Sequence, residues 1–325
     1  MIIDIILLIV GLVLILGGAN YLTDGAAAVA RRFGMSDLMV GLTIVAFGTS
    51  APELTISIMS AIDGNTGIAI GNVVGSNIFN TLIIIGAVAV ARPIKITGGI
   101  MSKEIPLVVL SAAALLAMGS SKWLDGTTPV ISRVDGILLL LFFAIFMRYV
   151  FSQSKQKMPE TSENSNETKP VQTALWKSVI FIIGGLAALI YGGDLFVDKA
   201  SAIASSLGVS DAIIGLTIVA MGTSLPELAT SLTAAIKGNS GIAIGNVIGS
   251  NIFNIFLVLG CSATIRPLPF GAISEIDLLV LFASCVLFWI FGWFFGNRTI
   301  NRAEGGLLVA GYIAYMIYLV ADASM

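Results

Sequence analysis

The chain has 325 residues, of which 57% are hydrophobic and 11% are charged, and its formal net charge at neutral pH is −2. Soluble domains carry about a quarter of their residues as charged side chains, so this composition excludes an ordinary soluble protein. The sequence contains no histidine, which excludes histidine-based acid–base catalysis, proton relay and zinc ligation. Cys261 and Cys285 both fall in apolar runs and match no disulfide or metal-ligand spacing, so we interpret them as membrane-embedded hydrophobes.

Long apolar runs separated by short polar hinges predict membrane-spanning helices of about twenty residues each. The first run lacks a basic start and a recognisable cleavage site, so we expect a retained helix and not a cleaved signal peptide. The count predicts an all-α membrane protein with ten transmembrane helices. Their ranges are 2–22, 37–62, 66–91, 102–119, 134–151, 174–196, 211–236, 240–265, 273–295 and 303–322.

A polar stretch divides these helices into two groups of five. Residues 152–173 are rich in Ser, Thr, Glu and Lys and cannot bury enough apolar surface to fold, which predicts a flexible linker. We therefore expect a first half over residues 1–151 and a second half over residues 174–325.

Lysine and arginine residues are concentrated in alternate hinges. With the N-terminus outside, the inner hinges hold 13 of the 17 basic residues, and the outer hinges hold only Lys122, Arg133, Lys199 and Arg266. The positive-inside rule then predicts a multi-pass protein of the plasma (inner) membrane, with both termini outside and the 152–173 linker cytoplasmic. Because five is odd, the second half enters the membrane upside down, which gives the inverted-topology repeat of many secondary transporters.

One stretch occurs twice. Residues 41–86 and residues 215–260 align without gaps at an offset of 174, with 31 of 46 positions identical. Each copy is apolar yet carries a glutamate in its middle, Glu53 in the first and Glu227 in the second. An ionisable residue at bilayer depth is destabilising and therefore indicates function.

Each glutamate closes a motif that predicts a broken helix, GTSAPE in the first copy and GTSLPE in the second. Pro52 lacks an amide hydrogen and its ring clashes with the carbonyl of Gly48. We expect the carbonyls around Ala46, Gly48 and Thr49 to lose their internal partners and to face protein, water or an ion. With the hydroxyls of Thr49 and Ser50 they form a hard oxygen set, suited to sodium, calcium or magnesium. The equivalent residues of the second copy are Ala220, Thr223, Ser224, Pro226 and Glu227.

The following helix adds further oxygen ligands through GNVVGSNIFN and GNVIGSNIFN. Ser76 and Asn80 are four residues apart and share one helix face, as do Ser250 and Asn254. Further amides lie nearby at Asn72, Asn77, Asn246 and Asn251. The alternative is that these polar side chains only join helices, a contribution of about 1–2 kcal/mol each at most.

Charge predicts how such a site would work. Two facing carboxylates without a basic partner repel each other, and one calcium ion, two sodium ions or two protons would neutralise them. A third sodium on the Ser and Asn ligands would leave the loaded site at +1. We hypothesise that the protein can switch the side on which the site is open only when the charge of the site is neutralised, so that ions exchange and do not leak. The sequence leaves the stoichiometry open.

At these motifs the chain resembles the cation/calcium exchanger superfamily, specifically its prokaryotic sodium/calcium exchanger branch. The resemblance implies ten helices, with the second, third, seventh and eighth around the ions and the first and sixth sliding across them. It implies that Glu53 and Glu227, with the carbonyls of Thr49 and Thr223, bind calcium. It also implies sodium ligation by the carbonyls of Ala46 and Ala220 and the hydroxyls of Ser50, Ser76, Ser224 and Ser250, with Asn80 and Asn254 at the middle site.

Within that superfamily, potassium-dependent exchangers carry aspartate at the position of Asn254, so the resemblance argues against potassium co-transport. It implies a calcium-for-sodium antiporter that works by alternating access. We expect no catalytic residue and no cofactor, and we infer no nucleic acid or protein partner beyond the bilayer and the transported calcium and sodium ions. A proton/calcium antiporter on the same fold and a passive cation channel remain open; an intramembrane enzyme has no nucleophile motif to support it.

Overall fold

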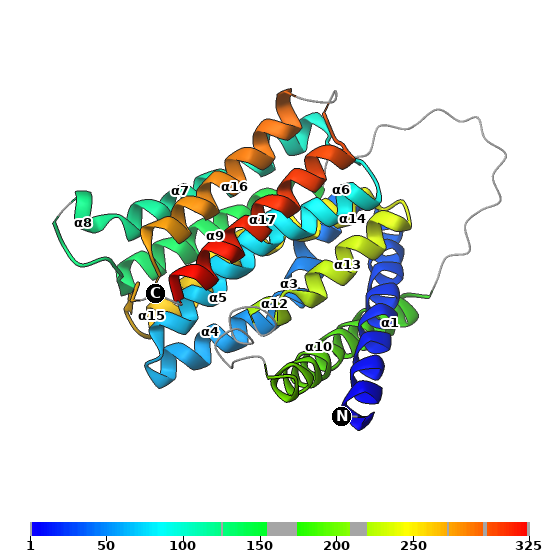
Figure 1. The fold of residues 1–325 in the computed structure, drawn as a ribbon. Coiled ribbons are helices and arrows are strands. Elements are labelled where there is room, and N and C mark those ends of the chain that lie inside the picture. Colours follow the sequence, from blue (N-terminus) through cyan, green and yellow to red (C-terminus); the bar gives the residue numbers. More distant parts are fainter. Residues whose placement is uncertain are drawn as a thin grey trace.

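The computed structural model describes residues 2–124, 126–154, 174–208, 220–271, 273–294 and 298–323, and the described chain is almost entirely helical (Figure 1). Within these ranges eight helices are long and apolar enough to cross a membrane, and a bent pair over residues 37–63 forms a possible ninth span. Of the predicted seventh helix, 211–236, the part from 211 to 219 lies outside the described residues. The protein is therefore a helical membrane protein with multiple spans.

The elements follow the predicted order. The first half contains α1 (Ile2–Phe33), α2 (Asp37–Val40), η1 (Gly41–Val45), α3 (Ala46–Thr49), α4 (Ala51–Asp63), α5 (Thr66–Phe79), η2 (Asn80–Ile84), α6 (Ile85–Ala91), η3 (Ile100–Glu104), α7 (Ile105–Gly119), α8 (Ser121–Leu124) and α9 (Arg133–Ser154). The second half contains α10 (Leu175–Ser206), α12 (Ala220–Gly222), α13 (Leu225–Ile236), α14 (Ser240–Ile252), η5 (Phe253–Val258), α15 (Leu259–Ile265), α16 (Glu275–Phe294) and α17 (Arg302–Ala323). The η elements are π-helical turns within longer helices, and α9 extends three residues into the segment expected to be a linker.

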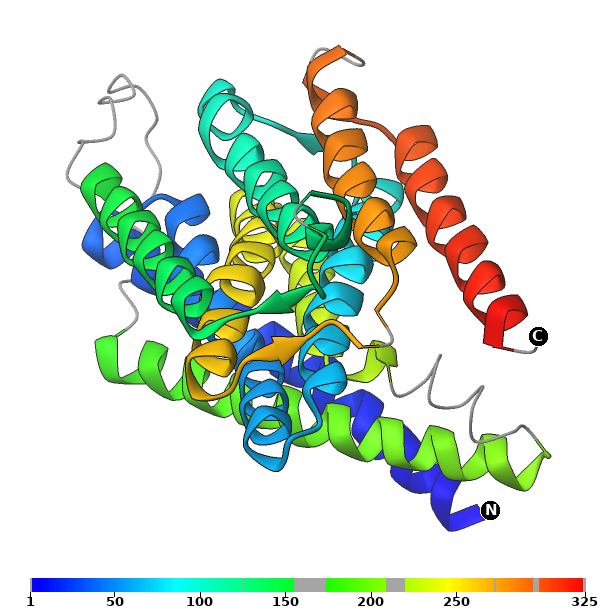
Figure 2. The ribbon, with the colours of Figure 1, turned by 90° about the vertical axis from the view of Figure 1, so that its left-hand side faces the viewer.

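Helices α1 and α10 cross one another beneath the rest of the bundle (Figure 2). Each has 32 residues and is therefore about 48 Å long, well beyond the bilayer core, so both must tilt. The predicted ends at residues 22 and 196 were wrong. The helices continue because alanine-rich segments, such as residues 26–30, favour helix beyond the most apolar stretch.

Glycines allow the two crossing helices to touch. A Cβ added to Gly18 would lie 2.7 Å from the carbonyl oxygen of Gly185, and one added to Gly11 would lie 2.9 Å from that of Gly192. Positions 11 and 185 differ by 174, as do positions 18 and 192, so the crossing follows the internal repeat. Backbones approach this closely only where both residues lack a side chain.

The core lies around α5 and α14, which are buried along most of their length. Helix α14 packs against α2 and η1 of the other half, where a Cβ on Gly245 would lie 2.5 Å from the carbonyl oxygen of Leu38. Each repeat's third predicted helix thus packs against segments of the other repeat, which brings the two copies of the repeated motif together.

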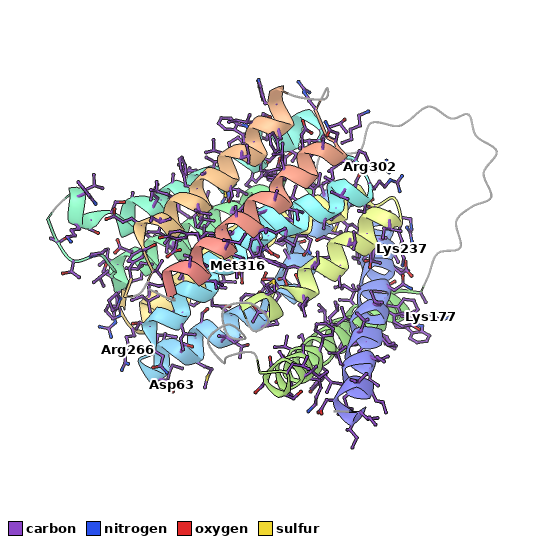
Figure 3. All side chains as sticks on the ribbon, in the orientation of Figure 1. Asp63, Lys177, Lys237, Arg266, Arg302 and Met316 are labelled. Atoms are coloured by element: carbon purple, nitrogen blue, oxygen red, sulfur yellow. The ribbon has the colours of Figure 1, made fainter. Side chains whose placement is uncertain are left out.

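Two short antiparallel strand pairs connect the halves. β1 (Ile94–Lys95) pairs with β4 (Thr299–Ile300), and β2 (Val130–Ile131) pairs with β3 (Leu268–Pro269). Figure 3 places Asp63 and Arg266 at one end of the bundle and Lys237 and Arg302 at the other. The helix ends therefore form two opposite edges, as expected for a protein that crosses a membrane.

Candidate cation-binding site

The helix of the first repeat breaks at Ser50, where the segments over residues 37–49 and 51–63 meet at 46°. Pro52 lies in the first turn of α4 and leaves the Gly48 carbonyl without the amide of the residue four positions on. Among the hydrogen bonds of the described residues, the Thr49 carbonyl receives none from the Glu53 amide. The break thus frees backbone oxygens next to the glutamate, as expected.

The expectation that the break also frees the Ala46 carbonyl was wrong. The Ser50 amide donates a hydrogen bond to the Ala46 carbonyl at 3.0 Å. The proline removes only its own amide, so the helical ladder is interrupted from Gly48 onward and not one turn earlier. A cation at Ala46 would have to use the second lone pair of that oxygen.

The second repeat breaks in the same way. Helix α12 ends at Gly222, and α13 begins at Leu225 with Pro226 in its first turn. The Ser224 amide donates to the Met221 carbonyl at 3.2 Å, which is a tighter turn than an α-helical one. Ala220 begins α12 directly after the undescribed residues 209–219, and the sodium-binding role predicted for its carbonyl stays a prediction.

The two glutamates share one site. Both are fully buried, and each lies in the first turn of a half-helix, where the helix dipole favours negative charge. The Ser50 hydroxyl donates to Glu227 Oε1 at 3.1 Å, and the Ser224 hydroxyl donates to Glu53 Oε1 at 3.4 Å. Each repeat therefore supplies a serine to the carboxylate of the other.

The second oxygen of each carboxylate is available to a ligand. Within the described residues, Oε2 of Glu53 and Oε2 of Glu227 are buried without a hydrogen-bond partner, and no basic side chain pairs with either glutamate. Buried carboxylate oxygens normally have partners, so these two indicate a place for a cation. The described residues contain no cluster of three acidic, cysteine or histidine side chains, and the oxygens that lie near the glutamates there belong to serine and threonine hydroxyls, asparagine amides and backbone carbonyls.

The serine and asparagine pairs of the next helices differ in their hydrogen bonds between the two repeats. Ser76 donates to Glu53 Oε1 at 3.5 Å, whereas the buried Ser250 hydroxyl has no partner among the described residues. Asn80 is buried with both amide atoms unpartnered in the same ranges, while Asn254 donates to Asn77 Oδ1 at 3.0 Å. Both asparagines lie in π-helical turns, which are frequent at functional sites.

The threonines that precede the breaks contact two asparagines for which the sequence left open a place near the ions or a role in helix packing alone. The Thr49 hydroxyl donates to Asn246 Oδ1 at 3.1 Å, and the Thr223 hydroxyl donates to Asn72 Oδ1 at 3.5 Å. The available signal was that both asparagines occupy identical positions of the two copies. Their contacts cross between repeats, which no spacing within one copy predicts.

A cavity of about 340 Å³ reaches the breaks beside α10. It lies between α4 and α10, where Pro52, Thr223 and Pro226 meet the acidic residues Asp194 and Asp198 of α10. On the other side α1 packs along α13, and Lys237 binds Asp24 with Nζ 2.6 Å from Oδ1. The site is therefore approached beside α10 and covered beside α1.

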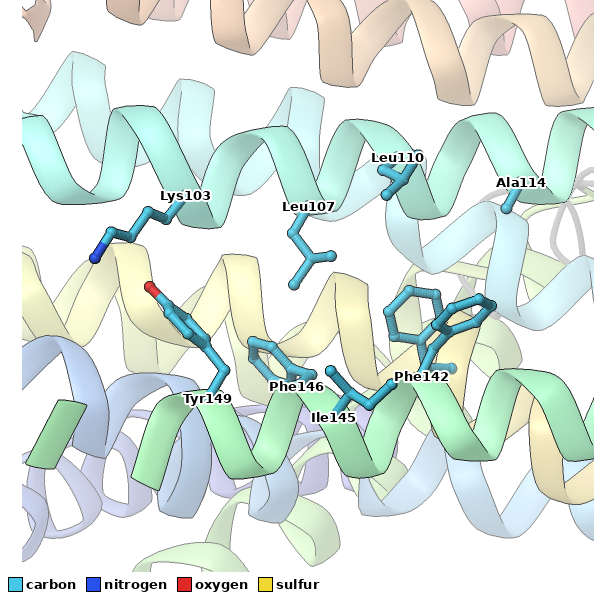
Figure 4. Close-up of a pocket in the computed structure, with 9 residues that line it drawn as sticks. Lys103, Leu107, Leu110, Ala114, Phe142, Ile145, Phe146 and Tyr149 are labelled. Carbon is cyan, nitrogen blue, oxygen red and sulfur yellow. The ribbon is translucent and has the colours of Figure 1, made fainter. Parts of the chain in front are cut away.

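A second groove, of about 420 Å³, lies between α7 and α9 (Figure 4). Its walls are apolar, and Lys103 and Tyr149 lie together at one end of it. None of the candidate cation ligands lines it. This groove therefore offers no cation chemistry, and the site at the two breaks remains the candidate.

A membrane protein with two buried carboxylates surrounded by carbonyl, hydroxyl and amide oxygens belongs to the class of proteins that handle hard cations. Comparison with known proteins identifies the family. The profile of the family described as "Sodium/calcium exchanger protein" matches residues 3–152 and 177–321.

Individual relatives match over nearly the whole chain. CaxA of Alkalimonas amylolytica, which is named provisionally as an antiporter, is 38% identical and covers 99% of this chain and 100% of its own. The sodium/calcium exchanger MaX1 of Methanosarcina acetivorans is 33% identical, with 98% of each chain covered. A structure of the sodium-calcium exchanger NCX_Mj superposes with a TM-score of 0.82 at 32% identity, over 98% of this chain and 99% of that one.

The chain therefore belongs to the sodium/calcium exchanger family, as the motifs predicted. It is a multi-spanning member of a cation/calcium antiporter family and not an enzyme. Exchangers of this family transport calcium and sodium, the two ions that the sequence predicted.

Proposed function

We propose that this protein exchanges calcium for sodium across the membrane by alternating access. The observation that carries the proposal is the pair of buried glutamates, each bonded to a serine of the opposite repeat and each retaining an oxygen without a partner in the described chain. A site with two uncompensated buried carboxylates is stabilised when bound cations or protons neutralise its charge. One calcium or two sodium ions balance its charge, which favours exchange over uncoupled flow.

The proposed ligand roles are those that the resemblance to sodium/calcium exchangers implies for the matching positions. Glu53 and Glu227, with the carbonyls of Thr49 and Thr223, would form the calcium site. Sodium would use the hydroxyls of Ser50, Ser224, Ser76 and Ser250 and the carbonyls of Ala46 and Ala220, and Asn80 and Asn254 would line the middle. A neutral Asn254 adds no third charge, so the site needs no potassium ion for neutrality.

The proposed architecture is ten helices in two inverted halves, residues 1–151 and 174–325, with the second helix of each half broken. The cavity beside α10 and the covered face beside α1 support alternating access, because the repeat makes the two sides equivalent. Sliding of the α1–α10 pair would open one side as it covers the other.

The proposed orientation in the plasma (inner) membrane places both termini outside and the 152–173 linker in the cytoplasm. Lys237 and Arg302 lie at the end of the bundle opposite Arg266 (Figure 3), and the positive-inside count assigns the former end to the cytoplasm. The cavity beside α10 would then open outward. Labelling of single cysteines at the two ends in whole cells tests this assignment.

The decisive experiment measures ⁴⁵Ca uptake into proteoliposomes loaded with sodium, potassium or choline at equal pH. Uptake that requires internal sodium is expected, and uptake that is indifferent to sodium contradicts the proposed coupling. Glu53→Gln and Glu227→Gln are each expected to abolish uptake while eluting from a sizing column as the wild type does. Full uptake by either variant contradicts the site.

Proton coupling is the second candidate, because each unpartnered carboxylate can bind one proton in place of a sodium ion. Under sodium-free conditions it predicts calcium uptake driven by an imposed pH gradient, with the interior acidic. Sodium coupling predicts no such uptake. A channel predicts uptake with neither gradient.

A further inference from the structure

We propose that Asn72 and Asn246 are positioning residues, each of which fixes the carboxylate of its own repeat to the helix break of the other. The inference rests on the function proposed above and assigns these amides a role beyond helix packing. It concerns residues outside the set of ion ligands. The amides act through the groups that they hold.

The side chain of Asn246 is fully buried and forms three hydrogen bonds. Its Nδ2 donates to the backbone carbonyl of Glu227 at 3.4 Å and to the Ser231 hydroxyl at 2.9 Å. Its Oδ1 accepts from the Thr49 hydroxyl at 3.1 Å. The amide therefore uses both of its hydrogens and its oxygen, and it bridges the two repeats.

The orientation of this amide is set by chemistry. A carbonyl oxygen can only accept, so the Glu227 carbonyl requires the Nδ2 end of Asn246 to face it. The Oδ1 end then faces Thr49, whose hydroxyl has to donate. The Thr49 hydroxyl lies 3.1 Å from this oxygen and 3.5 Å from the Ala46 carbonyl oxygen of its own repeat, so the contact with the other repeat is the shorter of the two. This contact holds the residue whose carbonyl the break has freed.

These contacts close a ring around the site. Asn246 holds the backbone of Glu227 and the side chain of Thr49, and the next residue, Ser50, donates to the Glu227 carboxylate at 3.1 Å. If the amide releases Thr49, the serine is no longer held opposite the carboxylate. Asn246 thus sets the alignment between the carboxylate of one half-site and the hydroxyl and carbonyl of the other.

The same ring occurs at the mirror position. Asn72 Nδ2 donates to the Glu53 carbonyl at 3.2 Å and to the Ser57 hydroxyl at 2.9 Å, and its Oδ1 accepts from Thr223 at 3.5 Å. Ser224, next to Thr223, donates to the Glu53 carboxylate at 3.4 Å. Two rings of equal composition, 174 residues apart, are unlike the scattered contacts of ordinary helix packing.

The rings differ in tightness. The bond from Thr223 is longer than that from Thr49, and Thr223 lines the cavity beside α10, whereas Thr49 is buried. The ring that contains Asn72 is therefore the looser one and lies on the open side. We expect Asn246 and Thr49 to show the stronger coupling in this state.

A double-mutant cycle tests the role. Asn246→Ala, Thr49→Val and their combination are compared in proteoliposomes by KM and maximal rate for sodium-dependent ⁴⁵Ca uptake. Thr223→Val combined with Asn246→Ala is the matched control, because this threonine has the same motif position but bonds to Asn72. Melting temperature is measured for every variant.

The expected result is that Thr49→Val raises KM, and that adding it to Asn246→Ala departs from the product of the single effects by about threefold or more. The control pair is expected to multiply within about twofold. Thr49→Ser, which keeps the hydroxyl, is expected to restore KM. If Asn246→Ala does not fold, the test uses the two Thr49 variants alone. The proposal then requires that Thr49→Val raises KM and that Thr49→Ser has the KM of the wild type.

The proposal is overturned if the Asn246 and Thr49 substitutions change KM independently. It is also overturned if the two substitutions are coupled in melting temperature while KM is unchanged, because that result indicates a structural role only. A wild-type protein without sodium-dependent calcium uptake instead overturns the proposed function. The two failures are thus told apart in one set of measurements.

Discussion

Lys237 at the end of α13 pairs with Asp24 of α1, with Nζ 2.6 Å from Oδ1. The repeat offset of 174 places Asp63 and Asp198 at the mirror positions, so the equivalent pair on the other side would be two carboxylates. The side beside α1 can therefore be held closed by an ion pair, whereas like charges oppose closure beside α10. This difference makes the internal symmetry incomplete, and in the proposed alternating-access cycle it would bias the two access states.

We predict that Lys237→Gln shifts the balance toward the state that is open beside α1. The pair is partly exposed and is worth at most about 1 kcal/mol, so the ratio of the apparent calcium affinities at the two faces is expected to change by up to about fivefold. The melting temperature is expected to stay close to that of the wild type. Uptake into right-side-out and inside-out vesicles measures the ratio.

Asp63→Lys is the matched counterpart of that variant, because it places a cation opposite Asp198. It is expected to shift the same ratio in the opposite direction. A shift in the same direction for both variants contradicts the gating role of this charge asymmetry.

The serines that bridge the repeats are predicted to be unequal. Ser50 is the side chain that donates to Glu227 Oε1, whereas Glu53 Oε1 accepts from both Ser224 and Ser76. Ser50→Ala therefore removes the serine hydrogen bond to Glu227, whereas Ser224→Ala leaves Glu53 with the hydrogen bond from Ser76. A hydrogen bond to a charged group contributes about 1.5–3 kcal/mol, so Ser50→Ala is expected to raise the KM for calcium about tenfold or more.

Ser224→Ala is expected to raise the KM less, because Ser76 still donates to Glu53. Combining it with Ser76→Ala is expected to reproduce the effect of Ser50→Ala. Equal KM values for Ser50→Ala and Ser224→Ala would argue against the observed partition of hydrogen bonds.

The order of the elements and the two helix breaks could be predicted from the sequence, because apolar length and proline chemistry are local properties. The meeting of Glu53 and Glu227 could also be expected, since both lie at the same position of a repeated motif. The bridging roles of Asn72 and Asn246 could not be predicted from the sequence, because each amide contacts a threonine of the other copy. Such contacts depend on how the halves pack and have no signature within one half.

The π-helical turns that begin at Asn80 and Phe253 could not be predicted, because the spacing of residues along these helices was interpreted with α-helical geometry. The full lengths of α1 and α10 were missed for a related reason. The predicted ends followed hydrophobicity, but the Ala-rich continuation of α1 is stabilised by helix propensity and by packing against α10.

We predict that Asn254→Asp makes exchange dependent on pH. Asn254 donates to Asn77 Oδ1 at 3.0 Å, and an ionised aspartate would lose that bond and bring the site to three negative charges. A protonated aspartate keeps a donor and stays neutral. Exchange is therefore expected to resemble the wild type at low pH and to fall as pH rises, in ⁴⁵Ca uptake measured across a pH series.

Asn80→Asp is the control for that variant, because it adds a charge at the mirror position where the asparagine amide has no partner among the described residues. A similar pH profile for both variants would mean that charge alone matters. A steeper fall for Asn254→Asp would assign part of the effect to the lost bond to Asn77. A pH-independent Asn254→Asp protein contradicts a place for this residue at the site.

The crossing of α1 and α10 gives the last prediction. A Cβ on Gly18 would lie 2.7 Å from the Gly185 carbonyl oxygen and 2.8 Å from the Leu189 amide, so the two helices would have to separate. The neighbouring Gly17 would place its Cβ in open space. Gly18→Ala is expected to lower the melting temperature and the maximal exchange rate, because the contact is between backbones and cannot be relieved by a side-chain rotation.

Gly17→Ala is the matched control on the same helix, one residue away. It relieves the low helix propensity of glycine, worth up to about 1 kcal/mol, without a new contact, so equal or higher thermal stability is expected. Melting of the purified protein and ⁴⁵Ca uptake measure the two variants side by side. Wild-type stability and rate in Gly18→Ala would show that the helices do not cross at Gly18 and Gly185, and the sliding proposed for this pair would then lose its structural basis.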